Sequence, residues 1–178
     1  MQEHRYDVLI VGAGGAGMRA AIEAGPEART AALTKLYPTR SHTGAAQGGM
    51  CAALANVEED NWEWHTFDTV KGGDYLADQD AVEIMSQEAG EAVLELERMG
   101  VIFSRGEDGK LGTRAFGGQK VARTFFVGAI TGSAILHVLF EQSLKLGLNV
   151  YEEWFVTKLI MEDGVCRGVV ALDIKTGE

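Results

Sequence analysis

Residues 6–17 read Tyr6-Asp7-Val8-Leu9-Ile10-Val11-Gly12-Ala13-Gly14-Gly15-Ala16-Gly17. The first half is apolar and rich in β-branched residues, which favours a strand buried on both faces of a parallel sheet. The second half matches GxGxxG and leads into residues 15–24, which are good helix formers. Residues 30–34 predict another short strand, so the chain opens with a βαβ unit.

A GxGxxG motif between a strand and a helix predicts a dinucleotide site. Its first glycine permits a tight turn, its second lets the backbone approach a pyrophosphate, and its third lets the helix pack on the sheet. The start of the helix offers N–H groups to phosphate. The motif therefore assigns cofactor binding to Gly12, Ala13, Gly14, Gly15, Ala16 and Gly17.

The second strand lacks the acid that usually holds the adenosine ribose about 20 residues after the glycines. It ends in Leu33-Thr34-Lys35 instead. We therefore expect either that the ribose is held by a hydroxyl group, by the backbone or by Lys35, or that the nucleotide binds in a different position. A simple NAD-binding domain is disfavoured on this ground.

The remaining chain predicts an α/β fold with a mostly parallel sheet and a β-hairpin region. Residues 37–49 form a long loop of small and polar residues, and loops of that length are usually functional. Helices are expected at 61–71, 80–99 and 131–146, with the apolar stripe of 80–99 facing the core. Residues 106–118 predict a hairpin or mobile loop, and strands are expected at 151–161 and 166–174. Residues 175–178 look like the tip of a further hairpin, so we expect the fold to be incomplete at its C-terminal end.

Composition excludes several classes of function. The formal net charge of −10 over 178 residues offers no basic patch for nucleic acid. No apolar run approaches the roughly 20 residues that cross a bilayer. The two cysteines, Cys51 and Cys166, lack the spacing of a zinc site, and we expect no metal. Asp74, Asp78 and Asp80 are expected to provide turn and N-cap contacts.

The loop carries the most specific signal, because residues 34–49 closely resemble the flavin loop of succinate dehydrogenase and fumarate reductase flavoprotein subunits. The resemblance continues through residues 58–62, 68–81 and 114–119 and covers nearly the whole chain. It implies a Rossmann-like FAD-binding domain in which the histidine of Ser41-His42-Thr43 is covalently linked to FAD. An electron-withdrawing substituent makes the flavin a better electron acceptor, which the oxidation of succinate requires.

The resemblance also assigns roles to individual residues. Gln47, Gly48 and Phe116 are expected near the dicarboxylate substrate, and Val156 is expected to meet the adenine through its backbone. The other residues expected to bind the cofactor are Thr34, Lys35, Arg40, Ser41, His42, Thr43, Ala45, Ala46, Gln47, Gly48 and Gly49.

One segment departs from the family pattern. An Ala-Asp-Arg-Thr-Gly-His sequence usually opens the last helix, whereas Ala129, Ile130 and Ser133 stand here in place of its Asp, Arg and His. None of the arginines Arg40, Arg105, Arg114 and Arg123 matches the family's proton-transferring position. We therefore expect no catalytic residue in this chain and no succinate turnover by the chain alone.

The resemblance further implies a place in a larger assembly. Residues 1–178 would be the N-terminal part of an FAD-binding domain, with the capping and C-terminal helical domains absent from this chain. The expected partners are an iron-sulfur subunit, which passes electrons to quinone, and membrane anchor subunits. The expected location is the cytoplasmic side of the plasma membrane, as a peripheral subunit, or the matrix side in a mitochondrion.

Three alternatives stay open. A fumarate reductase shares the histidyl-FAD loop and runs the same reaction in reverse. L-aspartate oxidase-like enzymes resemble this chain around the glycine motif and Gln47-Gly48-Gly49. They lack the flavin-linked histidine, so His42 argues against this alternative. A non-catalytic nucleotide-binding fragment is the third.

Overall fold

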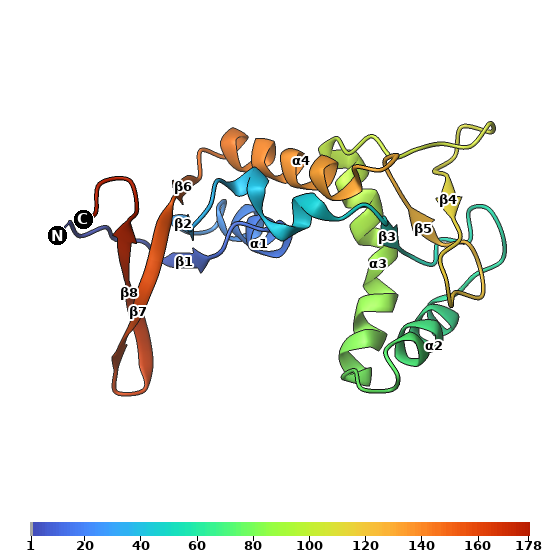
Figure 1. Cartoon of the computed structure of the whole chain (residues 1–178), viewed down its shortest axis with the longest axis horizontal. Coiled ribbons are helices and arrows are strands. Elements are labelled where there is room, and N and C mark those ends of the chain that lie inside the picture. Colours follow the sequence, from blue (N-terminus) through green and yellow to red (C-terminus); the bar gives the residue numbers. More distant parts are fainter. Residues whose placement is uncertain (1) are drawn as a thin grey trace. The chain divides into compact units, whose positions relative to one another are not determined.

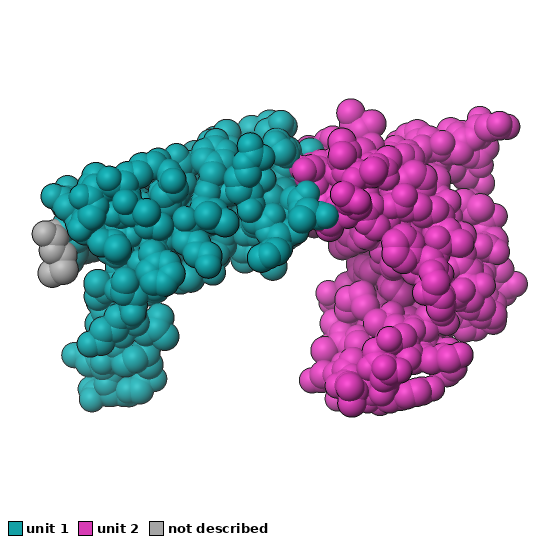
Figure 2. Space-filling model, viewed as in Figure 1, with its two compact units in different colours: residues 1–45, 135–178 teal, residues 46–134 magenta. Residues whose placement is uncertain are grey.

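The computed structural model describes residues 2–178, and these form two compact units. Unit 1 contains the chain up to Ala45 together with Ile135–Glu178, and unit 2 contains Ala46–Ala134. Figure 2 colours unit 1 teal and unit 2 magenta. The residues that the sequence assigns to cofactor and substrate are divided between the two units.

Unit 1 is built on a three-stranded parallel sheet (Figure 1). Strand β1 (Val8–Val11), helix α1 (Gly15–Ala24) and strand β2 (Thr30–Thr34) follow one another, and β6 (Asn149–Glu152) adds to the other side of β2. All five residues of the central strand β2 are buried, as expected for a strand covered on both faces. The predicted α/β fold with a parallel sheet is confirmed.

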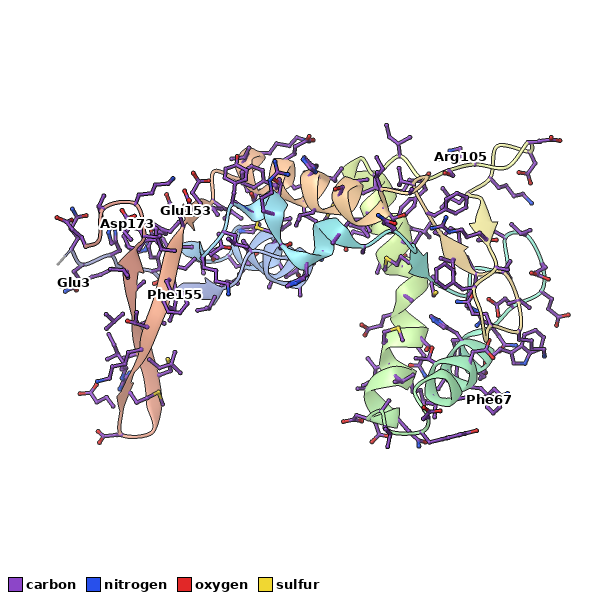
Figure 3. All side chains as sticks on the ribbon, viewed as in Figure 1. Glu3, Phe67, Arg105, Glu153, Phe155 and Asp173 are labelled. Carbon is purple, nitrogen blue, oxygen red and sulfur yellow. The ribbon has the colours of Figure 1, made fainter. Side chains whose placement is uncertain are left out.

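A long antiparallel hairpin follows the sheet, formed by β7 (Trp154–Glu162) and β8 (Val165–Asp173). The sequence predicted one strand over 151–161, which is wrong, because Glu153 has a φ of +62° and separates β6 from β7. Figure 3 shows Glu153 at this junction and Phe155 on β7. The Glu153 carboxylate lies 2.8 Å from Lys175 Nζ, and its carbonyl accepts from the Ile174 N–H at 2.9 Å. These contacts stabilise a backbone conformation that nothing in the local sequence signals.

Unit 2 combines two helices with a small antiparallel sheet. Helix α2 (Trp62–Gly72) is N-capped by Asn61, and helix α3 (Gln79–Met99) is N-capped by Asp78. The sheet has the order β3 (Met50–Cys51), β5 (Thr124–Phe125) and β4 (Thr113–Arg114).

The segment before β4 is a hairpin, in which Arg105 and Leu111 form an antiparallel bridge. Helix α4 (Thr131–Lys145) begins in unit 2 and continues in unit 1, where Leu136 and Leu139 are buried. None of the helices in residues 2–178 is both long enough and apolar enough to cross a membrane.

The buried face of α3 differs from the prediction. Helical spacing within residues 80–99 puts Ile84 and Met85 on the apolar stripe expected to face the core, but their exposed fractions are 56% and 42%. Leu96, which the predicted stripe also included, is buried as expected, together with Ser86, Ala89 and Val93. The reason is that α3 carries apolar residues over more than one face, so the sequence period alone does not decide which face packs inward.

Candidate functional site

The glycine-rich turn of unit 1 brings strand and helix into direct contact. Gly12 has a φ of +106°, which favours glycine, and its N–H donates to the Leu33 carbonyl at 2.7 Å. A Cβ added at Gly17 would lie 1.9 Å from the Gly12 carbonyl oxygen. Only glycine at position 17 therefore allows α1 to start this close to the end of β1.

The N-terminus of α1 is suited to an anion. Its N-cap is Gly14, which has no side chain to cap the helix, and the first turn contains no acidic residue. The N–H groups of a first helical turn and the helix dipole both favour negative charge. The local sequence thus leaves this helix end available to a phosphate group.

The loop that precedes unit 2 packs directly on the glycine turn. It forms two 3₁₀ helices, η1 (Pro38–Arg40) and η2 (His42–Ala45). The Thr43 hydroxyl accepts from the Gly15 N–H at 3.0 Å, and a Cβ added at Gly14 would lie 3.5 Å from both the Ser41 and Thr43 side-chain oxygens. The loop therefore lies at van der Waals distance from the fingerprint glycines.

The loop also leaves polar groups available to a cofactor. The Ser41 hydroxyl is buried and has no hydrogen-bond partner among residues 2–178. A buried hydroxyl without a partner is costly, so a polar ligand group would stabilise it. The neighbouring side chains of Arg40, His42 and Ala45 are exposed. An unsatisfied hydroxyl beside the glycine turn and the helix N-terminus fits the phosphate-bearing part of FAD.

The end of β2 shows which of the groups expected to hold the adenosine ribose are already engaged in hydrogen bonds. The Thr34 hydroxyl donates to the Leu36 carbonyl at 2.9 Å, so it is engaged within its own loop, whereas Lys35 is exposed. Val156 lies on β7, paired with Ala171 and next to an irregularity in the hairpin. The adenosine contacts of Thr34, Lys35 and Val156 stay predictions.

The second group of predicted residues lies in unit 2. Gly48 lies against Phe116, because a Cβ at Gly48 would come within 3.0 Å of the Phe116 ring. Gly49 has a φ of +124° and lies close to the Phe125 carbonyl, where a Cβ would be only 2.4 Å away. The carbonyl of Ala46 accepts from the Gly132 N–H at 2.8 Å, which ties this segment to the start of α4. The predicted substrate residues Gly48 and Phe116 are thus brought together.

Phe116 also borders a cavity of about 820 Å³ inside unit 2. Most of its wall is apolar and comes from α3, including the exposed Ile84 and Met85, and from the turn that follows Phe116. His65, Asp68 and Arg123 supply polar groups to the same wall.

A buried ionic network supports this cavity, and the sequence did not predict it. The Arg123 guanidinium, 1% exposed, donates to both Asp60 oxygens at 2.9 Å and to Asp68 at 2.6 Å. Burial alone would raise the pKa of Asp68, but hydrogen bonds from the Lys120 N–H and from Arg123 hold it below its usual value. Burial would likewise lower the pKa of Arg123, yet the two carboxylates raise it. Arg123 is therefore a fixed positive charge that joins α2 to β5.

His65 lies beside this network. It is 3% exposed, and its Nδ1 has no hydrogen-bond partner among residues 2–178. Burial lowers the pKa of His65, and the neighbouring Arg123 charge lowers it further against the opposing effect of the two aspartates. His65 is thus a packed residue of α2.

A parallel βαβ unit with a glycine turn, a helix whose first turn has no acidic residue and a loop packed over both defines a dinucleotide-binding protein. The family model described as "FAD binding domain" matches residues 7–178, and the chain belongs to this family.

Within this family, the chain is similar to flavoprotein subunits of two related enzymes. The chain is 52% identical over 183 residues to the succinate dehydrogenase flavoprotein subunit of Rickettsia conorii, covering 98% of this chain and 31% of that protein. It is 43% identical over 177 residues to the fumarate reductase flavoprotein subunit of Mycobacterium tuberculosis, covering 97% of this chain and 30% of the relative. A solved structure of an E. coli quinol fumarate reductase mutant superposes with a TM-score of 0.91 at 43% identity, covering 97% and 30% of the two chains. The chain thus spans about a third of the length of these relatives.

Proposed function

We propose that this chain is the N-terminal part of the flavoprotein subunit of a succinate dehydrogenase, which oxidises succinate to fumarate with FAD covalently bound to His42. One observation carries the proposal. The loop Ser41-His42-Thr43 packs on the glycine turn of an FAD-binding domain, through the hydrogen bond from Gly15 to Thr43, while His42 is exposed. The 52% identity to a succinate dehydrogenase flavoprotein subunit supports it.

When bound, FAD supplies the electron acceptor that the oxidation of a saturated dicarboxylate needs, and a histidyl substituent makes it a stronger acceptor. The residues from Gly12 to Gly17 hold the pyrophosphate at the start of α1. Ser41 and Thr43 fix the loop, and the buried Ser41 hydroxyl gains a partner from the cofactor. We expect Arg40, Ala45 and Ala46 to contribute to cofactor binding as well, and Thr34, Lys35 and Val156 to contact the adenosine.

The dicarboxylate lies beside Gln47, Gly48 and Phe116. Gly48 and Phe116 lie against each other, so both would border the same side of the substrate. The group that transfers the proton lies outside this chain, in a capping domain or beyond. The chain alone therefore holds cofactor and part of the substrate site without turning over succinate.

The assembly proposed for the complete protein contains an iron-sulfur subunit that receives the electrons, membrane anchor subunits and a quinone acceptor. The flavoprotein is a peripheral subunit on the cytoplasmic side of the plasma membrane, or on the matrix side in a mitochondrion. Similarity to succinate dehydrogenase and fumarate reductase flavoprotein subunits supports this arrangement.

Fumarate reductase is the second candidate, favoured by the 43% identity and the TM-score of 0.91 to a quinol fumarate reductase. Both enzymes use the same histidyl-FAD loop and differ in the direction they favour. Initial rates of succinate oxidation and of fumarate reduction by the complete protein, measured with artificial electron acceptors and donors, decide between them.

The variant His42→Ser in the complete protein tests the role of the histidine. We expect it to retain FAD without a covalent bond, to reduce fumarate, and to lose most of its succinate oxidation. His137→Ser, at an exposed histidine of α4, is the matched control and should behave like the unmodified protein. Unchanged succinate oxidation by His42→Ser contradicts the proposal, as does a lack of FAD in the unmodified protein.

A further inference from the structure

Arg114 on β4 binds the backbone of the segment expected at the substrate. Its Nε donates to the Gly48 carbonyl at 2.9 Å, and its Nη2 donates to the Gln47 carbonyl at 2.5 Å and also to that of Gly48. Nη1 reaches the Gly128 carbonyl at 3.4 Å. The planar guanidinium thus donates hydrogen bonds to the carbonyls of two consecutive peptide groups, which a lysine ammonium cannot do with the same geometry.

The guanidinium is held on its other sides by aromatic rings. Its central carbon lies 4.6 Å from the Phe126 ring centre and 5.8 Å from that of Phe116. Cation–π contacts of this kind restrict a side chain as well as stabilise its charge. Arg114 therefore links three residues already expected at the substrate, namely Gln47, Gly48 and Phe116.

The charge of Arg114 is not neutralised by the described part of the chain. No carboxylate of residues 2–178 forms an ion pair with it, whereas Arg105 pairs with Glu97 and Arg123 pairs with Asp60 and Asp68. A half-buried cation without a carboxylate partner produces a positive potential around it. A dianionic ligand next to Gly48 and Phe116 would experience that potential.

Peptide geometry adds a second consequence. In a trans peptide the carbonyl and the N–H point in opposite directions. Because Arg114 holds the carbonyls of Gln47 and Gly48, the N–H groups of Gly48 and Gly49 point away from it. Neither N–H donates to any residue in the described range 2–178. Two consecutive N–H groups that point the same way are suited to bind an anionic oxygen.

We propose that Arg114 is a positioning and specificity-determining residue for the dicarboxylate: it holds the Gln47-Gly48-Gly49 backbone with its N–H groups directed at the ligand, and it contributes the positive charge that favours a dianion. This inference rests on the proposed function. Arg114 acts through the backbone of its neighbours, so removing it weakens dicarboxylate binding more than it slows turnover.

The test uses the complete flavoprotein loaded with FAD and the variants Arg114→Gln and Arg114→Lys. Malonate is the binding probe, because a three-carbon dicarboxylate has no CH2–CH2 bond to oxidise. Its dissociation constant is measured from the change in flavin absorbance, and KM and kcat for succinate are measured separately. Arg105→Gln is the matched control, since Arg105 lies on the hairpin before β4, contacts Gly109 and Glu97, and touches none of the substrate residues (Figure 3).

We expect Arg114→Gln to raise the malonate dissociation constant and the KM for succinate by at least about tenfold, as for the loss of a charged hydrogen-bond donor, with a much smaller change in kcat. Arg114→Lys keeps the charge but loses the simultaneous hydrogen bonds to two carbonyls. Its malonate dissociation constant and its KM for succinate should therefore lie between those of Arg114→Gln and the unmodified protein. Should Arg114→Gln fail to fold, an increased KM in folded, FAD-containing Arg114→Lys carries the same test.

Arg105→Gln should leave both constants unchanged. Malonate binding by Arg114→Gln equal to that of the unmodified protein overturns the inference and leaves the proposed function intact. An unmodified protein that contains FAD but binds no malonate and oxidises no succinate overturns the proposed function itself.

Discussion

Gly17→Ala is a substitution whose effect can be worked out from the contact between α1 and β1. The added Cβ would lie 1.9 Å from the Gly12 carbonyl oxygen and 2.9 Å from its carbon. Real Cβ contacts almost never fall below 3.0 Å, so the helix must move away from the strand by about 1 Å. Alanine gains about 1 kcal/mol over glycine in a helix interior. Overpacking typically costs about 1–3 kcal/mol and outweighs that gain.

The same turn offers a matched control in Gly14→Ala. Here the added Cβ would lie 3.5 Å from the side-chain oxygens of Ser41 and Thr43, an ordinary van der Waals distance. We expect Gly14→Ala to leave the melting temperature of the FAD-free protein nearly unchanged, apart from an N-cap effect of up to about 1 kcal/mol. It should still weaken FAD binding, because the methyl group keeps a pyrophosphate from approaching the backbone.

The assay is a thermal melt of the FAD-free complete protein, followed by the FAD content after reconstitution and dialysis. Gly17→Ala should lower both the melting temperature and the FAD content, whereas Gly14→Ala should lower chiefly the FAD content. The reasoning is refuted by a Gly17→Ala protein that melts at the unmodified temperature with full FAD content.

Three other predictions concern unit 2. Arg123→Met leaves Asp60 and Asp68 without their buried counter-ion, so the free energy of unfolding in denaturant should fall by about 3–5 kcal/mol; a loss below about 1 kcal/mol would show that the network contributes little. Folding holds the pKa of His65 below its unfolded value of about 6.5, so the unfolded chain binds more protons on acidification. Stability should therefore decrease as the pH falls below about 6.5, and His65→Gln should show a shallower pH dependence; equal slopes in pH-dependent melts refute this. Asp78→Ala removes the N-cap of α3 and should cost about 1 kcal/mol in the same melts, while the exposed Asp80→Ala should cost less.

Much of unit 1 could be predicted because its signals are local. The strand, the glycine turn and α1 follow from residues 6–24, and the observed α1 covers Gly15–Ala24 as expected. The buried strand β2 was equally clear from its apolar run. The separation of β6 from β7 could not be predicted, because Glu153 takes its positive φ from contacts with Lys175 and Ile174, which lie more than 20 residues away.

Unit 2 was harder to predict because its structure depends on contacts between distant segments. The strands β3, β4 and β5 have two residues each, too few for any period-two pattern. Arg123 carries no sequence signal for burial, and its partners Asp60 and Asp68 precede it by more than 50 residues. From the sequence, Arg114 was considered only as a candidate for proton transfer. Its hydrogen bonds to Gln47 and Gly48 could not be predicted, because they span more than 60 residues. The sequence predicted the individual site residues, whereas the contacts that hold Gln47 and Gly48 in place could be found only in the structure.

The attachment of FAD to His42 is the central claim, and the mass of one peptide tests it most directly. The complete protein, expressed with FAD, is denatured, digested with protease and analysed by tandem mass spectrometry. We predict that the peptide containing Ser41-His42-Thr43 carries the mass of FAD on the His42 ring. An unmodified His42 peptide, with all the flavin recovered free after denaturation, would contradict the account.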